Sequence, residues 1–83
     1  MFMFRTQVTS DIIRDGLGVE LLNERDQIIA EVFRSDRDKT VIVNTFSNDV
    51  SLAALQQLIA RALEDLEPFE DGTALSGAVN GCT

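Results

Sequence analysis

The sequence contains no histidine, tyrosine or tryptophan, and this absence removes several kinds of chemistry before any fold is considered. Histidine is the commonest general base and the commonest transition-metal ligand, so Ser-His and Cys-His nucleophile pairs and zinc sites built from cysteine and histidine are excluded. We therefore expect no catalytic residue, no metal site and no bound cofactor. The sequence predicts a protein that is not an enzyme.

Cysteine and long apolar runs are also scarce. Cys82 is the only cysteine, so an intrachain disulfide cannot form and the cytoplasm is the simplest compartment. The start, residues 1–5, is too short and too soon polar for a signal peptide, and no apolar run approaches the length that spans a membrane. We expect a cytoplasmic protein without a membrane partner, and the sequence does not decide whether translation starts at Met1 or Met3.

Cationic residues are few: seven Lys or Arg stand against fourteen Asp or Glu, for a net charge of −7. This balance argues against direct binding to nucleic acid, because cationic side chains supply most of the affinity for phosphate. It is compatible with a solvated acidic surface or with a basic partner. The hydrophobic fraction of 45% is too high for a disordered chain, so 83 residues predict one small domain with a marginal core.

One stretch, residues 51–66, has the period of an amphipathic helix. Asn48, Asp49 or Ser51 can cap its start, and Pro68 biases Glu67 out of helical geometry at its end. No glycine or proline interrupts it, and several alanines favour the helix. Its apolar side chains recur at three- and four-residue steps: Leu52, Leu55, Ile59, Ala62, Leu63 and Leu66.

Before this helix come four β-branched and aromatic segments separated by short polar turns, at about 6–14, 17–23, 27–35 and 39–46. Asp15-Gly16 is a hairpin signal between the first two. Because no helix separates the segments, neighbours must pair antiparallel. A short helix over the first segment, capped by Ser10 and ended by Gly16, is the alternative.

The predicted fold is therefore α+β: an antiparallel β-meander of three or four strands packed by one long C-terminal α-helix. We expect residues 1–67 to form this single domain. Residues 68–83 mix Gly, Ser, Thr, Asn and acidic residues without a period. They predict a flexible, mostly disordered tail in which Phe69 is the residue that can fold back onto the domain.

The last two strand segments carry apolar side chains on both faces, whereas a single helix covers only one. The uncovered face could be closed by Phe2 and Phe4, by a second copy or by another protein, since large apolar patches on soluble monomers often mark interfaces. All of these residues could also be ordinary core. The alternation predicts an apolar patch on the second face made of Ile29, Phe33, Ile42 and Phe46.

Charged clusters offer little chemistry. Asp36-Arg37-Asp38 lacks the glycine and the spaced ligands of a calcium loop, so a hairpin turn is the better interpretation. Carboxylates on the second and third strands are expected to be solvated strand-face charges. The cations of the meander are expected to form a mixed-charge surface with the neighbouring acids: Arg25, Arg34, Arg37 and Lys39.

These features favour a small acidic protein that acts as a protein–protein interaction or regulatory module and forms a homodimer through the second sheet face. The alternative is an acidic mimic or immunity-type protein that binds a basic toxin or a nucleic-acid-binding protein. A third class, an enzyme using carboxylates, would need a buried Asp or Glu in a cleft. The mimic requires seven carboxylates on one contiguous surface: Glu20, Glu24, Asp26, Glu31, Glu64, Asp65 and Glu67.

Overall fold

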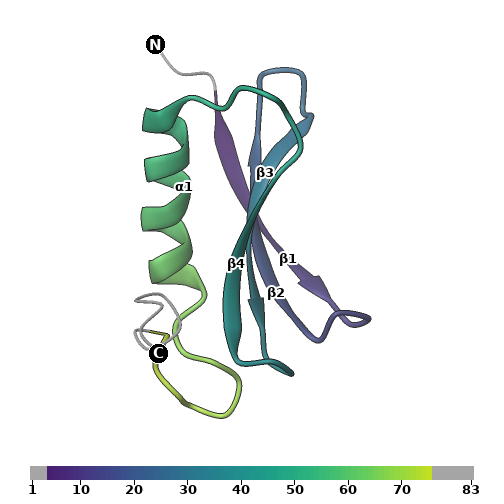
Figure 1. Cartoon of the computed structure of the whole chain (residues 1–83), viewed down its shortest axis with the longest axis vertical. Helices are drawn as coiled ribbons and strands as arrows, with labels where there is room; N and C mark the ends of the chain where they lie inside the picture. The colour runs from purple at the N-terminus through teal and green to yellow at the C-terminus, as the bar shows by residue number, and fades with distance from the viewer. Residues whose placement is uncertain (1–3, 76–83) are drawn as a thin grey trace.

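The computed structural model describes residues 4–75 and confirms the predicted α+β meander. Four strands form one antiparallel sheet in the order β1-β2-β3-β4, and one helix lies against one of its faces (Figure 1). The first segment is a strand, so the alternative of a short helix there is wrong. The elements are β1 (Arg5–Asp11), β2 (Gly16–Leu22), β3 (Ile28–Ser35), β4 (Thr40–Thr45) and α1 (Leu52–Asp65).

The first hairpin has a longer loop than Asp15-Gly16 alone predicts. β1 ends at Asp11, and residues 12–15 form the loop. The Asp11 carboxylate accepts a hydrogen bond from the Arg14 backbone N–H at 2.9 Å, and Asp15 has a positive φ of 54°. Because a short acidic side chain can replace strand pairing for nearby N–H groups, the ladder stops at Asp11.

Gly16 opens β2 where the backbones of two strands approach closely. A Cβ atom at this position would lie 1.9 Å from the carbonyl oxygen of Arg34 and 2.6 Å from Cζ of Phe33. No side chain other than hydrogen fits there. The glycine is required by β3 and not only by the turn.

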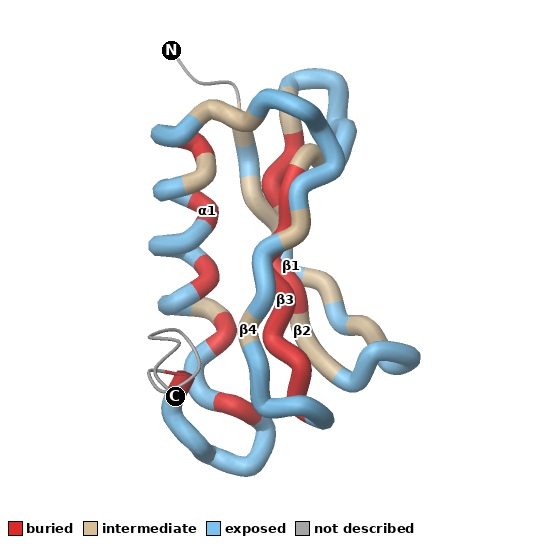
Figure 2. The backbone as a smooth tube through the Cα atoms, viewed as in Figure 1, coloured by how far each residue is buried: buried red, intermediate tan, exposed pale blue. Residues whose placement is uncertain are grey.

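The main core lies between the sheet and α1, as the buried positions in Figure 2 show. Ser51 caps the helix by accepting a hydrogen bond from the Ala54 N–H, and α1 packs over β1, β2 and β3. The outer strands are covered less: Val8 on β1 and Val43 on β4 are 49% and 47% exposed. The core residues of these elements are Val19, Leu21, Ala30, Val32, Ala54, Leu58, Ala62 and Leu66.

A β-bulge changes which side chains of β3 face the helix. Leu21 pairs with Ala30 and Leu22 with Ile28, so Ile29 is an extra residue in the ladder. Such a residue interrupts the strict alternation of side chains. Ile29 consequently packs against the helix-facing core, while Ile28 is 40% exposed. The predicted assignment of Ile29 to the second face is therefore wrong.

The segment that follows the helix belongs to the folded domain up to Leu75. Phe69 and Leu75 are 3% and 1% exposed and join the core. The expected domain boundary after residue 67 thus falls inside packed structure. The sequence predicted that Phe69 can fold back onto the domain, but it did not predict the burial of Leu75. Two isolated apolar residues in a polar segment have no period by which a sequence pattern could reveal them. Residues 76–83 lie outside the described part of the chain.

Candidate interaction surface

A polar band crosses the middle of the sheet face that α1 does not cover. Register aligns Gln7, Glu20, Glu31 and Asn44 side by side across all four strands. Gln7 donates to Glu20 at 2.7 Å, and Asn44 donates to Glu31 at 3.0 Å. The second face is therefore not a continuous apolar surface.

Arg14 reaches from the first hairpin loop onto this face and covers Phe33. Its Nη1 donates to Oε1 of Glu31 at 2.8 Å, and its guanidinium carbon lies 4.0 Å from the centre of the Phe33 ring. A cation over an aromatic face is attracted by the ring quadrupole. Phe33 also lies beside Gly18, which has no side chain to displace it. The ring is only 2% exposed, so the loop of the same chain covers it.

The charges around Arg14 stabilise one another. The hydrogen bond from Arg14 lowers the pKa of Glu31, although burial acts in the opposite direction. The backbone N–H and the guanidinium of Arg14 lower the pKa of Asp11. The pKa of Arg14 is raised by its hydrogen bonds to Glu31 and then to Asp11. Glu31 is therefore a fully paired carboxylate, which is poorly suited to act as a general acid or base near neutral pH.

The predicted patch is only partly formed, although Phe33 pairs directly with Ile42 on the second face. Ile42 and Phe46 are exposed on the second face, by 45% and 60%, whereas Phe33 is buried under Arg14 and Ile29 packs toward the helix. The exposed apolar residue that accompanies them is Ile28. It borders, with Phe46 and the polar band, an open hollow of about 640 Å³. The role of this face as an interface stays a prediction.

A second apolar region lies on the helix side of β4. Val43, Ile59 and Leu63 are 47%, 37% and 42% exposed, because α1 packs over the other three strands. An open groove of about 210 Å³ lies between β4 and α1. The described residues that line it are all apolar: Val32, Val41, Val43, Ile59, Ala62, Leu63, Leu66 and Leu75.

The tip of the first hairpin is a third exposed apolar region. Ile12 and Ile13 are 93% and 92% exposed, and the tip projects away from α1 in Figure 1. Because both side chains are almost fully exposed to water, they contribute almost no buried apolar surface to the folded chain. Since β1 was predicted to extend to residue 14, sequence reasoning placed them in a strand and missed their exposure.

Arg34 is buried and holds the segment after the helix against β3. Its Nη1 donates to the carbonyl oxygens of Leu66 and Pro68, at 2.9 and 2.7 Å, and its Nη2 to Asp36 at 2.9 Å. These carbonyls at the helix end need donors. The expectation of a surface role for Arg34 is wrong. Its spacing from Val32, two residues on the same strand face, was the available signal.

The carboxylates beside Arg34 could in principle hold a metal ion. Oxygens of Asp15, Asp36 and Glu70 lie within 4.8 Å of one another. Both oxygens of Asp36 are already used, because Oδ1 accepts from the Glu70 backbone N–H at 2.8 Å and Oδ2 accepts from Arg34. A cation here would also sit next to a guanidinium. The position of Asp36 is therefore explained by its hydrogen bonds to Arg34 and to the Glu70 backbone, and no bound ion is needed to explain it.

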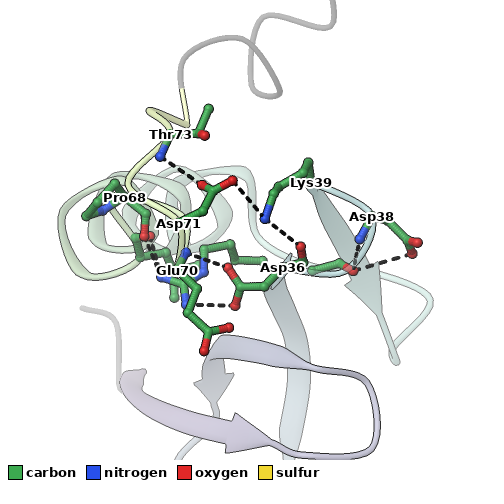
Figure 3. Close-up of polar contacts among 10 residues, drawn as sticks. Asp36, Asp38, Lys39, Pro68, Glu70, Asp71 and Thr73 are labelled. Carbon is green, nitrogen blue, oxygen red and sulfur yellow. Dashed lines mark hydrogen bonds and ion pairs between the residues drawn. The ribbon is translucent and has the colours of Figure 1, made fainter.

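Lys39 and Asp71 make a second link between the β3–β4 turn and the final segment. Lys39 Nζ lies 3.2 Å from Oδ2 of Asp71, and Asp71 accepts the Thr73 backbone N–H at 2.9 Å (Figure 3). The hydrogen bonds from Thr73, with that of Lys39, lower the pKa of Asp71 to about 2. Residues 36–39 form a turn as expected, and two charged residues of this turn, Asp36 and Lys39, bind Glu70 and Asp71.

The seven acidic residues that a nucleic-acid mimic would need are dispersed. Glu31 is 4% exposed and paired with Arg14, and Asp26 is paired with Arg5. Glu20 lies on the second sheet face, whereas Glu64 lies on α1 in the other layer. Asp65 pairs with Arg61, whose pKa it raises. These placements do not favour the mimic.

Comparisons with known proteins assign the chain to no family. No protein-family model matches it, and neither a curated protein nor a solved structure shows significant similarity to it. Within residues 4–75, no helix combines the length and the apolarity needed to cross a membrane. Function must therefore be argued from the three exposed apolar regions.

Proposed function

We propose that the protein is a non-enzymatic, cytoplasmic protein–protein interaction or regulatory module. The observation that carries this proposal is the exposure of apolar side chains on both faces of β4. Ile42 and Phe46 are exposed on the second face, and Val43 is exposed on the helix face. Apolar side chains that remain in water and border polar groups are typical of interfaces.

The polar band beside these residues supports the same function. Arg14, Glu31 and Asn44 are already held by hydrogen bonds within the chain. A partner that covers Ile42 and Phe46 therefore meets an ordered rim and does not have to immobilise it, which reduces the entropic cost of binding. The buried carboxylates Glu31 and Asp36 are paired with arginines, which favours a binding role over acid–base catalysis.

Affinity capture from a native lysate of the producing cells tests the proposal. The immobilised wild-type chain should retain a defined protein, which mass spectrometry identifies. The double variant Ile42→Asp, Phe46→Asp should lose it, because charge is placed at the centre of the interface. The matched control is Leu52→Asp, since Leu52 is 69% exposed on α1 and away from β4.

Retention by the wild type and by the Leu52 control, with loss in the double variant, supports the proposal. Identical retention by all three chains, or retention of nothing by a wild-type chain that is also monomeric, overturns it. Circular dichroism of each variant establishes that the fold is intact. Both replaced positions are substantially exposed, so little effect on folding is expected.

A further inference from the structure

Within residues 4–75, β4 is an edge strand with no strand paired to its outer side. It forms one border of the sheet, and its sequence from Thr40 to Phe46, TVIVNTF, has no charge, proline or glycine. Edge strands of monomeric proteins are normally blunted by lysine, proline or a bulge, because their free backbone groups can pair with another strand. The other border, β1, is bounded by Arg5 and Asp11 and is mostly polar between them. The two edges are therefore not equivalent.

The free backbone groups of β4 can be identified from the ladder. The Phe46 N–H donates to the carbonyl of Ile29 on β3 at 2.9 Å. Backbone groups along an antiparallel strand alternate in direction, so Ile42 and Asn44 also face β3. The N–H and C=O groups of Val41 and Val43 then point outward from the sheet and are available to a further strand.

We propose that a second copy of this chain is the partner, and that two β4 strands pair antiparallel about a two-fold axis at Ile42. The inference deepens the proposed interaction module and rests on it. Opposed residues must share a sheet face, and centring the pair on Ile42 places Val41 of each copy opposite Val43 of the other. These valines make hydrogen-bonded pairs through their outward groups, and every contact at the centre of the seam is apolar.

The sequence of β4 supports a second copy, because it is self-complementary about Ile42. Val41 and Val43 stand on either side of the central residue, so each meets an apolar counterpart, and the flanking pair is Thr40 with Asn44. No acidic residue opposes another along the seam. Although each copy carries a net charge of −7, the strand that meets its counterpart is neutral.

The groove between β4 and α1 extends the contact beyond the strands. Val43, Ile59 and Leu63 border it and are partly exposed. In the two-fold pair, Val41 of the second copy lies against Val43. The groove of the second copy then lies next to the groove of the first. Isologous contacts of this kind are the commonest in homo-oligomers, and they remove both free β4 edges at once.

Cysteine cross-linking tests the register. In a Cys82→Ser background, Ile42→Cys places two thiols opposite each other at a pair without hydrogen bonds, where the Cα atoms are about 4.5 Å apart. This separation is within the range that a disulfide spans. Mild oxidation should therefore convert Ile42→Cys to a covalent dimer. The control is Ile12→Cys, which is more exposed, at 93% in the wild type, but far along the chain from β4.

Sedimentation equilibrium over a range of concentrations tests the association itself. The wild type should show the mass of a dimer, and Val43→Lys should show the mass of a monomer, because lysine is an edge-protecting residue. Leu52→Lys, on the exposed side of α1, should remain dimeric. The urea-unfolding midpoint of each chain at low concentration shows whether the fold of the subunit is retained.

A dimer that is lost in Val43→Lys, together with selective cross-linking of Ile42→Cys, supports the proposal. A wild-type chain that is monomeric throughout overturns it, as does cross-linking of Ile12→Cys at an equal or higher rate. Capture of a different protein by a monomeric chain overturns the second copy as partner and leaves the interaction module standing. The two proposals thus fail separately.

Discussion

At the scale of single residues, two arginines organise the polar interactions that the fold encloses. Arg14 pairs with Glu31 on one sheet face, and Arg34 pairs with Asp36 on the other side of the domain. The Arg14 side chain is 43% exposed, whereas that of Arg34 is only 9% exposed. Water screens the first pair and hardly reaches the second, so the two should differ in their effect on stability.

Glu31→Gln should lower the free energy of unfolding by about 1 kcal/mol at neutral pH, since its partner is partly solvated. Because Arg14 lowers the pKa of folded Glu31, the stabilisation is complete above the unfolded pKa of about 4.3 and declines as the pH falls through the folded value. In urea unfolding at a series of pH values, the difference in free energy of unfolding between the wild type and Glu31→Gln should shrink as the pH falls. An equal gap at every pH would contradict the assignment.

Arg34→Met should destabilise far more, by about 3–5 kcal/mol, because buried Asp36 loses its cation and the carbonyls of Leu66 and Pro68 lose their donor. Equilibrium unfolding in urea measures the change. Arg37→Met is the control, since the Arg37 side chain is 70% exposed, and it should change stability by less than about 0.5 kcal/mol. Equal effects of the two substitutions would show that Arg34 is not a structural anchor.

At the scale of elements, the start of β2 depends on the absence of a side chain at Gly16. Gly16→Ala should cost about 3 kcal/mol, because the new methyl group meets the rigid backbone of Arg34. Gly18→Ala should cost no more than about 1 kcal/mol, since its nearest neighbours would lie at 3.5 Å, an ordinary contact distance. Thermal unfolding of both variants measures the two costs. A larger effect at Gly18 than at Gly16 would contradict the close approach of β2 and β3 at Gly16.

The segment after α1 should behave as part of the core. Leu75→Ala removes a side chain that is 1% exposed and should lower the free energy of unfolding by about 2–5 kcal/mol. Leu52→Ala removes the same atoms from a side chain that is 69% exposed and should change it by less than about 1 kcal/mol. Similar values for the two variants in urea would return the domain boundary to residue 67.

The order and type of these elements were predictable because their periods are strong. Features that depend on a single side chain could not be predicted from these periods. The hairpin loop depends on a hydrogen bond of Asp11, and the bulge at Ile29 breaks the alternation from which faces were assigned. For the candidate surface, Ile42 and Phe46 were placed on an exposed face correctly. Phe33 lies on the same face as predicted, but its burial was missed, since no pattern indicates that Arg14 folds over it.

At the scale of the whole molecule, net charge opposes self-association and salt should relieve it. Two copies that each carry −7 repel at low ionic strength, and added salt screens this repulsion while leaving the apolar seam intact. The dimer dissociation constant from sedimentation equilibrium should therefore fall as sodium chloride is added. Dissociation by salt would instead indicate an association held by opposite charges, as expected for a basic partner.

All four strands precede α1 along the chain, and this order has a consequence during translation. Hairpins form within about 10 microseconds, whereas residues 46–75 take a few seconds to be synthesised. Neighbouring strands therefore have time to pair before the helix that covers Val19, Leu21 and Val32 has been made. Until α1 packs on them these apolar side chains face water, and transient exposure of this kind makes a folding chain prone to aggregate.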